Sequence, residues 1–239
     1  MGTVILQELQ WDSEFFGFRV GKLQESGQPV SAFDLLAQMK ASGFRLVYWD
    51  STNPQDELIR YHVIDQVLLE ADQTLSTASV LGITSFTVRE RPKSYPDSQI
   101  IDLALQAGWS SRFRVDPGFS EDQFRRMYET WIRRSCMHEI ADCILTVDDG
   151  PNCAGFLSLS LRNGCAHVSL MAVSPKYRQQ GIGRLLLKDA ARYSAERGCS
   201  RMRVVTQSNN FAALRLYEGS GFQPVDVRHW YHFWADDCG

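Results

Sequence analysis

Val168-Ser-Leu-Met-Ala-Val173, followed by Ser174-Pro-Lys-Tyr-Arg178-Gln-Gln-Gly181-Ile-Gly183, is the stretch that decides the fold of this chain. Its first six residues suit a β-strand, Pro175 cannot continue a strand ladder, and an apolar run of helical spacing begins near Gly181. The stretch therefore predicts a strand, a loop and a helix. The first turn of such a helix has unpaired backbone N–H groups and a partial positive charge, so this junction can bind an anion such as phosphate.

Two glycines and an arginine favour a phosphate site at this junction. Gly181 and Gly183 have no Cβ atom where the main chain would approach a ligand closely, and Arg178 adds a positive charge beside them. The alternative is an ordinary strand-to-helix turn in which the glycines serve packing. A short Gly-x-Gly pattern alone does not separate the two interpretations.

A second pattern downstream favours the phosphate site. Arg201-Met-Arg-Val-Val-Thr206 predicts the next strand, and residues 210–222 predict a short helix that ends at glycine. Together the two patterns resemble the GCN5-related N-acetyltransferases. In that family an Arg/Gln-x-x-Gly-x-Gly/Ala loop binds the pyrophosphate of acetyl-CoA, and here it is matched by residues 178–183. The family's second pattern, Asn-x-x-Ala-x-x-Leu-Tyr-x-x-x-Gly-Phe, is met without a gap at Asn210, Ala213, Leu216, Tyr217, Gly221 and Phe222.

The resemblance implies which residues bind acetyl-CoA and which one delivers a proton. The implied cofactor-binding residues are Met171, Ala172, Val173, Arg178, Gln179, Gln180, Gly181, Ile182, Gly183, Arg184, Asn210, Ala213 and Tyr217. Main-chain groups of Met171 and Val173 would meet pantetheine, and Asn210 would orient the cofactor or the helix. Tyr217 is the implied general acid, because a phenol of pKa ~10 can share a proton with a thiol of pKa ~8.5. A tyrosine that only packs on the final helix is the alternative.

A closer resemblance concerns the acceptor. Trp11-Asp-Ser-Glu-Phe15-Phe16-Gly17, Ser111-Arg112-Phe113-Arg114 and residues 205–210 are similar to the dTDP-fucosamine acetyltransferase group. That group acetylates the 4-amino group of a dTDP-linked amino-dideoxy sugar, for cell-surface polysaccharide precursors. The resemblance implies a nucleotide-sugar acceptor that contacts Phe15, Phe16, Arg112 and Phe113. Residues 11–17 equally suit an aromatic lid without substrate contacts.

Charged residues supply candidates for the diphosphate and for the general base. An excess of arginine, at positions 112, 114, 133 and 134, suits phosphate geometry, although the last two close a helix where cations are favoured anyway. Glu70 and Asp72 lie in an otherwise apolar stretch that the resemblance would bring towards the active site, where burial would raise the pKa of a carboxyl group and make it a base. A solvated strand face is the alternative for both. His229 and His232 are the other candidate bases, unless they face water.

Composition limits the remaining function classes. The chain has 239 residues and a net charge of -3, and its pI is near 6.0. These values argue against a nucleic-acid or membrane-surface binder. No apolar run approaches ~18 residues, and the first residues lack the order of a signal peptide. We expect a cytoplasmic protein without membrane insertion or nucleic-acid partner, and a homodimer is left open.

The six cysteines predict no metal site. None of them forms a Cys-x-x-Cys pair, and their intervals to His138 and His167 fit no familiar zinc pattern, so we expect reduced thiols.

The fold class that we expect is α/β, a mixed and bent sheet flanked by helices as in the GCN5-related acetyltransferases. Residues 109–239 would form the acetyl-CoA-binding domain. Residues 1–108 would form a smaller α/β domain on the acceptor side. Its Gly43-to-Tyr61 stretch echoes residues 198–217 and suggests a degenerate half of the same fold. A peptide or small-amine acetyltransferase and a non-catalytic acetyl-CoA-binding module remain alternative functions.

Overall fold

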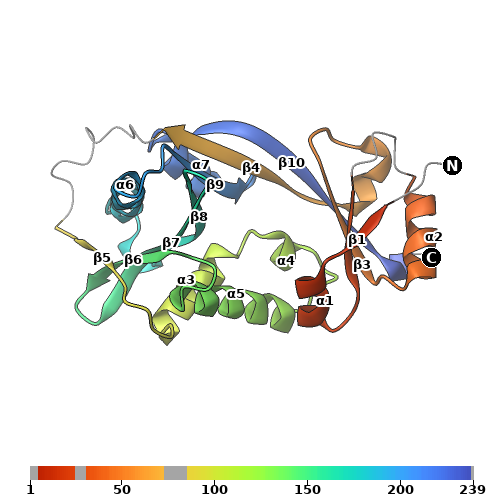
Figure 1. Cartoon of the computed structure of the whole chain (residues 1–239), viewed down its shortest axis with the longest axis horizontal. Helices are drawn as coiled ribbons and strands as arrows, with labels where there is room; N and C mark the ends of the chain where they lie inside the picture. Colours follow the sequence, from red (N-terminus) through yellow and green to blue (C-terminus); the bar gives the residue numbers. More distant parts are fainter. Residues whose placement is uncertain (1–4, 25–30, 73–84, 238–239) are drawn as a thin grey trace. The chain divides into compact units, whose positions relative to one another are not determined.

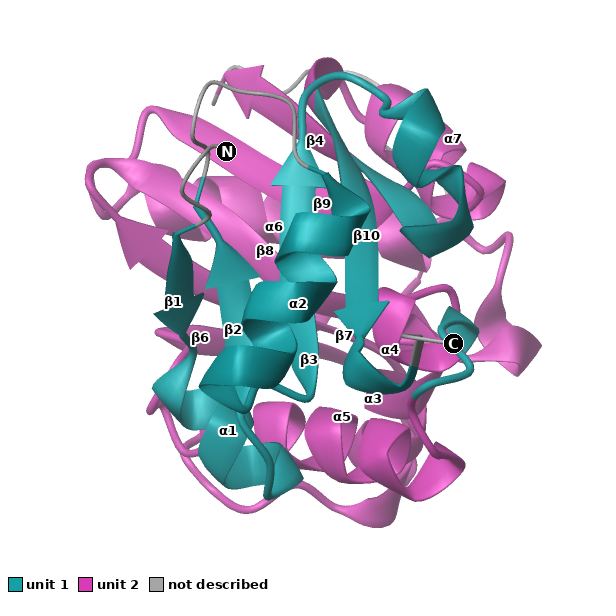
Figure 2. Cartoon of the chain, turned by 90° about the vertical axis from the view of Figure 1, so that its right-hand side faces the viewer, with its two compact units in different colours: residues 1–66, 115–118, 227–239 teal, residues 67–114, 119–226 magenta. Residues whose placement is uncertain are grey.

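The computed structural model describes residues 5–24, 31–72 and 85–237. The chain divides into two compact units, shown in Figure 2: unit 1 comprises residues 1–66, 115–118 and 227–239, and unit 2 comprises residues 67–114 and 119–226. Strands β4 (His62–Asp72) and β10 (Gln223–Trp234) each run from one unit into the other. Compactness does not test which segments fold independently, so the division into residues 1–108 and 109–239 stays a prediction.

Unit 1 is a small sheet covered by one helix. Its strands follow the order β1-β2-β3-β10-β4. Its elements before β4 are β1 (Leu6–Glu8), α1 (Gln10–Phe16), β2 (Val20–Leu23), α2 (Ala32–Ser42), β3 (Leu46–Ser51) and the 3-10 helix η1 (Asp56–Tyr61). The α2 residues Leu35 and Met39 are fully buried and belong to one apolar cluster with Val47 of β3 and Phe233 of β10. This cluster is the core of unit 1.

Unit 2 holds the elements between residues 88 and 218. They are β5 (Val88–Glu90), α3 (Ser98–Ala107), α4 (Arg112–Val115), α5 (Glu121–Cys136), β6 (Cys143–Asp149), β7 (Asn152–Arg162), β8 (Cys165–Val173), the 3-10 helix η3 (Pro175–Tyr177), α6 (Ile182–Ala195), β9 (Arg201–Gln207) and α7 (Phe211–Glu218). Its strands follow the order β4-β9-β8-β7-β6-β5. β8 is parallel to β9 and antiparallel to β7, so the predicted mixed sheet is confirmed.

Local signals in the sequence explain the boundaries of these elements. Ser120 and Gln123 form a capping box at the start of α5. Asn163 and Gly164, with φ of 52° and 70°, form a tight turn between β7 and β8. Both features follow from residue types that lie close to one another in the sequence.

The sheet of unit 2 is buried on both faces. Leu186 and Ala190 of α6 lie in one apolar cluster with alternate residues of β6 and β7, such as Leu145 and Leu157. The intervening residues along β6 and β7, such as Ile144 and Phe156, are also buried but lie outside that cluster. Helix α3 packs on β7 and β8 and against α5, and Figure 1 shows α3 and α5 on the side of the sheet opposite α6. Helices on both faces were predicted, and this arrangement confirms them. In the described ranges, no helix is long and apolar enough to cross a bilayer.

Candidate active site

A bulge interrupts β8 just before the predicted pantetheine-binding residues. Leu159 pairs with Val168 and Ser158 pairs with Leu170, so Ser169 is one extra residue on β8. The Ser158 side chain is fully buried, and its Oγ accepts a hydrogen bond of 2.9 Å from the backbone N–H of Leu170. The serine hydroxyl thus satisfies a main-chain group beside the interrupted ladder. No local sequence pattern indicates this role of Ser158, because its partner lies on the neighbouring strand.

Beyond the bulge, β8 separates from its parallel neighbour. In the described part of the chain, the pairing of β8 with β9 runs only from Cys165 to Val168, whereas β8 continues along β7 to Val173. Main-chain groups of Met171, Ala172 and Val173 on the β9 side therefore lie past the end of the ladder. This separation provides the main-chain groups that the acetyltransferase resemblance implies for pantetheine.

The loop after β8 is held by its own side chains. Tyr177 is buried and donates its hydroxyl hydrogen to Asp149 at 2.9 Å. The exposed Arg178 donates from Nε to the Val173 carbonyl oxygen at 3.2 Å. Gln179 and Gly181 have positive φ of 61° and 79°. A main chain that alternates in this way turns successive N–H groups toward one side and makes a concavity for an anion.

Helix α6 begins directly at this loop. Gly181 is its N-cap residue, and Leu185 donates the first backbone bond of the helix, to the Gly181 carbonyl at 3.0 Å. The N–H groups of residues 182–184 therefore have no intrahelical acceptor. A Cβ atom on Gly183 would lie 2.9 Å from Cδ2 of Leu216 in α7. Packing thus explains Gly183, but it does not explain the positive φ of Gly181 or the open N–H groups.

The remaining side chains of the loop differ in exposure. Three side chains are exposed, those of Gln179, Gln180 and Arg184. The Gln180 amide donates a hydrogen bond to the Lys176 carbonyl oxygen. The side chain of Ile182 is buried. The loop therefore offers polar groups outward and one apolar anchor inward.

Tyr217 lies on α7 in the core of unit 2. It is 6% exposed, and its ring centroid is 5.8 Å from that of Phe222. Burial raises the pKa of the Tyr217 phenol, so at neutral pH it is protonated. Asn210 accepts a hydrogen bond from the backbone N–H of Ala213 at 3.3 Å and caps α7. Of the two roles expected for Asn210, the structure thus displays the one that orients the helix.

Glu70 has a different environment from the one that a general base needs. Its carboxylate accepts hydrogen bonds from Arg203 at 2.5 Å and from Arg201 at 3.3 Å. The Arg203 hydrogen bond is the largest influence, and together these arginines lower the pKa of Glu70. The expectation that burial would raise this pKa is therefore wrong, because the two arginines outweigh the effect of burial. Asp72 is exposed at the end of β4.

The predicted acceptor residues occur in both units, and each set has local aromatic contacts. In unit 1, the half-buried Phe15 stacks on Trp11 with ring centroids 5.1 Å apart, and Phe16 meets Phe15 edge-on. In unit 2, the Arg112 guanidinium lies 4.6 Å from the ring centroid of the buried Phe113. Arg114 and Arg134 form ion pairs with Glu121 and Glu139, so their charges are balanced within the protein.

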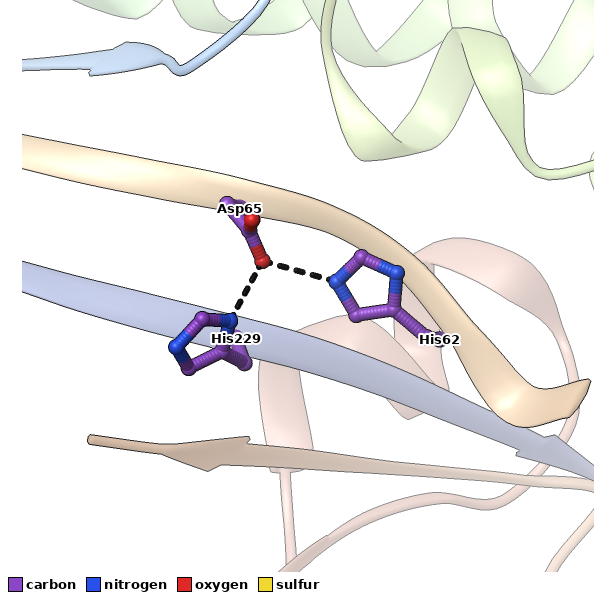
Figure 3. Close-up of side chains that lie close together, drawn as sticks. All are labelled: His62, Asp65 and His229. Carbon is purple, nitrogen blue, oxygen red and sulfur yellow. Dashed lines mark hydrogen bonds and ion pairs between the residues drawn. The ribbon is translucent and has the colours of Figure 1, made fainter. Parts of the chain in front are cut away.

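The two histidines of β10 each face an aspartate. His232 is 3% exposed, and its Nδ1 lies 2.5 Å from Asp116, which also accepts from Trp234 and from the backbone N–H of Gly118. His229 lies 2.6 Å from Asp65, which is shared with His62 (Figure 3). Each histidine side chain therefore contacts a carboxylate of the protein. Neither simply faces water, which was the alternative for these positions of the strand. The aspartate partners lie far away in the sequence, so no local pattern could reveal them.

The described cysteines are free thiols, as expected. Cys136, Cys143, Cys165 and Cys199 are buried, and Cys153 is half-buried. Burial raises the pKa of Cys136 to about 11 and that of Cys143 to about 12. Cys238 lies outside the described residues.

Open main-chain N–H groups at the start of α6, beside a pair of parallel strands that separate, are the arrangement that we expect of an acyl-CoA-dependent transferase. The chain belongs to the acetyltransferase (GNAT) family, whose model matches residues 103–222, half of its length. It is therefore an N-acetyltransferase, as the two sequence patterns predicted.

Characterised relatives resemble different portions of the chain. The spore coat polysaccharide biosynthesis protein SpsD of Bacillus subtilis is 27% identical over 60% of the chain, which spans only about half (49%) of that relative. The dTDP-fucosamine acetyltransferase of Escherichia coli O6:H1 is 25% identical over 94% of the chain and 96% of the relative. The human N-alpha-acetyltransferase 30 is 30% identical, over 40% of the chain and 28% of the relative.

Solved structures agree with the fold. A GCN5-related N-acetyltransferase from Sphaerobacter thermophilus aligns with a TM-score of 0.59, 12% identity, 97% of this chain and 76% of that one. A tandem GNAT protein from the clavulanic acid biosynthesis pathway aligns with a TM-score of 0.56 and 12% identity over 90% of this chain and 75% of that one. The expected fold class is thereby confirmed.

Proposed function

We propose that this protein transfers the acetyl group of acetyl-CoA to the amino group of a nucleotide-linked amino-dideoxy sugar, with dTDP as the nucleotide. The observation that supports the proposal most is the share of the chain that one relative matches. The dTDP-fucosamine acetyltransferase corresponds to 94% of the chain, including unit 1, whereas the N-alpha-acetyltransferase corresponds to 40%. Residues outside the acetyl-CoA motifs thus share their pattern with a sugar-modifying enzyme. The name of SpsD supports the same setting, polysaccharide biosynthesis.

The donor half of the proposal rests on main-chain groups. The N–H groups of residues 182–184 and the loop with positive φ at Gln179 and Gly181 suit the pyrophosphate of acetyl-CoA. The backbone of Met171 and Val173, past the end of the β8–β9 ladder, suits the amide groups of pantetheine. Arg178 would add its charge to the phosphate site.

Tyr217 is proposed as the general acid. The neutral amine attacks the thioester carbonyl, and a main-chain N–H near Met171 donates to the developing oxyanion. The new C–N bond forms as the C–S bond breaks, and the proton of the Tyr217 hydroxyl passes to the departing sulfur. The Tyr217 phenol holds a proton at neutral pH, as this role requires, while its burial raises its pKa and so makes it a weaker acid than a phenol in water. The proton that the amine loses goes to water, and Tyr217 regains one from the same source.

Glu70 is not included as the base. A carboxylate that accepts from Arg201 and Arg203 is a poor proton acceptor, because protonation would break both ion pairs. Arg112 and Phe113 stay in the proposal as acceptor contacts. The guanidinium beside the Phe113 ring can bind a phosphate oxygen while its flat face stays on the aromatic ring.

A peptide N-acetyltransferase is the second candidate, and the similarity to N-alpha-acetyltransferase 30 favours it. Such an enzyme would use the same donor residues. The two candidates therefore differ only in the acceptor.

An acceptor panel tests the proposal. Thiol release from acetyl-CoA is measured with nucleotide-linked 4-amino sugars, the same sugars without nucleotide, polyamines and N-terminal peptides, and each product is identified by mass spectrometry. We expect turnover with the nucleotide-linked sugars. Turnover with peptides alone would overturn the acceptor while leaving the donor unaffected. Absence of thiol release with every acceptor, in protein that binds acetyl-CoA, would favour the non-catalytic module.

A further inference from the structure

We propose that His62, Asp65 and His229 form a binding site for a divalent transition metal ion, with Zn²⁺ as the best-matched ion. The three residues come from two strands, β4 and β10, and Figure 3 shows their side chains pointing toward one another. One ligand atom from each residue lies within 4.8 Å of the other two. This inference does not depend on the acceptor proposed above.

Both imidazoles of the cluster contact the same carboxylate oxygen. His62 Nε2 lies 2.7 Å and His229 Nδ1 lies 2.6 Å from the same oxygen, Oδ1 of Asp65. Two imidazoles and one carboxylate are the donor set of catalytic zinc sites and of other transition-metal sites. Tetrahedral Zn²⁺ with bonds of ~2.0–2.1 Å needs donors about 3.3 Å apart, so small rotations of the side chains make room for it.

An irregularity in β4 brings two of the ligands to one side. Buried residues of β4 occur at positions 64, 67, 69 and 71, so the two-residue alternation slips by one position around Asp65. His62 and Asp65, three residues apart, would lie on opposite faces of a regular strand. The slip explains how their side chains meet.

The charge of the cluster also suits a cation. Asp65 contributes the only carboxylate among the three residues, and its side chain faces two imidazoles. In the described part of the chain, both hydrogen bonds to Asp65 end on Oδ1, which leaves Oδ2 as a further oxygen donor.

Comparison with the other histidine–aspartate pair shows what is particular to this cluster. The side chains of His232 and Asp116 are 1% and 5% exposed, and Asp116 receives additional bonds from Trp234 and Gly118. That pair is closed to an ion. The side chains of His62, Asp65 and His229 are 26%, 30% and 16% exposed, so an ion can enter and keep a position for water.

Binding of the ion would take the place of protons on the two ring nitrogens that face Asp65, and no group changes its oxidation state. The lone pairs of His62 Nε2 and His229 Nδ1 would bind the metal, and the proton of each neutral ring would reside on its other nitrogen. The Asp65 carboxylate supplies the negative charge. The ion would link β4 to β10 beside the positions where both strands pass from unit 1 into unit 2.

Metal binding to the full chain, purified without a histidine tag and treated with chelator, tests the site. We expect calorimetry with Zn²⁺ to show about one equivalent bound, and His229→Gln and Asp65→Asn to weaken binding ~100-fold or more. His138→Gln is the control, because His138 is an exposed histidine outside the cluster. Equal binding by the wild type and by all three variants would overturn the site.

Co²⁺ provides a second measurement that needs no variant. We expect wild-type protein to give the visible absorption of four-coordinate Co²⁺ without the near-ultraviolet charge-transfer band of thiolate ligands, because the site holds no cysteine. A thiolate band would assign the metal to the cysteines and contradict the proposal, as would absence of Zn²⁺ and Co²⁺ binding by folded wild-type protein.

Discussion

The proposed acetyl-CoA loop of unit 2, residues 178–183, and the histidine–aspartate clusters of unit 1 hold their polar groups in different ways. The loop uses main-chain N–H groups of consecutive residues, so a short local sequence pattern predicts where these groups lie. In unit 1, side chains from distant segments meet, as Asp116 does with His232. A site built from main chain has a local motif, whereas a site built from remote side chains depends on the topology.

The largest effect on stability that we predict concerns the buried pair of Asp116 and His232 in unit 1. Asp116→Ala removes the partner of His232 and Trp234 and leaves a buried histidine without its aspartate. We expect the free energy of unfolding to fall by about 3 kcal/mol, measured by urea denaturation. Asp122→Ala, at an exposed carboxylate, should change it by less than ~0.5 kcal/mol. Equal values for both variants would contradict a structural role of Asp116.

The same pair predicts a dependence on pH. Burial alone would raise the pKa of Asp116, but hydrogen bonds from His232, Gly118 and Trp234 lower it. The contribution to stability is therefore complete above the unfolded-state pKa of ~3.9 and is lost as the pH falls through the lower folded pKa. Urea denaturation below pH ~4 should show the wild type losing its advantage over Asp116→Asn. A constant difference across this range would rule out the linkage.

In the acetyl-CoA region, Tyr217→Phe should have the largest effect on catalysis. Loss of the hydroxyl removes the proposed proton donor, so we expect kcat to fall ~10-fold or more with little change in the KM for acetyl-CoA. The control is Tyr193→Phe, at a half-buried tyrosine of α6 outside the predicted site. Normal turnover by folded Tyr217→Phe would remove Tyr217 from the mechanism.

Ser158→Ala tests whether the bulge of β8 needs its hydroxyl. The variant leaves the buried N–H of Leu170 without its acceptor. We expect a loss of about 1–2 kcal/mol in stability and a higher KM for acetyl-CoA, by thermal unfolding and steady-state kinetics. Ser160→Ala, at the next buried serine of β7, is the matched control. The same KM in both variants would show that the bulge does not position the donor.

The smallest effect should come from Glu70→Gln. The variant loses partly exposed ion pairs with Arg201 and Arg203, so we expect a stability change of at most ~1 kcal/mol. We also expect kcat to change less than about 2-fold across the pH profile, because the proposed mechanism does not use Glu70 as the base. A large fall in kcat with loss of the acidic limb of the profile would restore Glu70 as the base.

Sequence patterns predicted most of unit 2 because each of its signals is local. The capping box at Ser120, the turn at Asn163 and the glycine of the α6 N-cap each act within a few residues. The patterns could not show that Glu70 meets two arginines of β9, because strand register decides that contact. They also missed the cluster of Figure 3, in which His229 lies 164 residues after Asp65 in the sequence.

The acceptor is the point at which the account is most directly tested. The measurement is kcat/KM, from thiol release with acetyl-CoA, for a dTDP-linked 4-amino-dideoxy sugar and for an N-terminal peptide. The account predicts a ratio of ~100-fold or more in favour of the sugar nucleotide, with one acetyl group found on its amine, because binding of the nucleotide contributes to transition-state stabilisation. A ratio in favour of the peptide would contradict it.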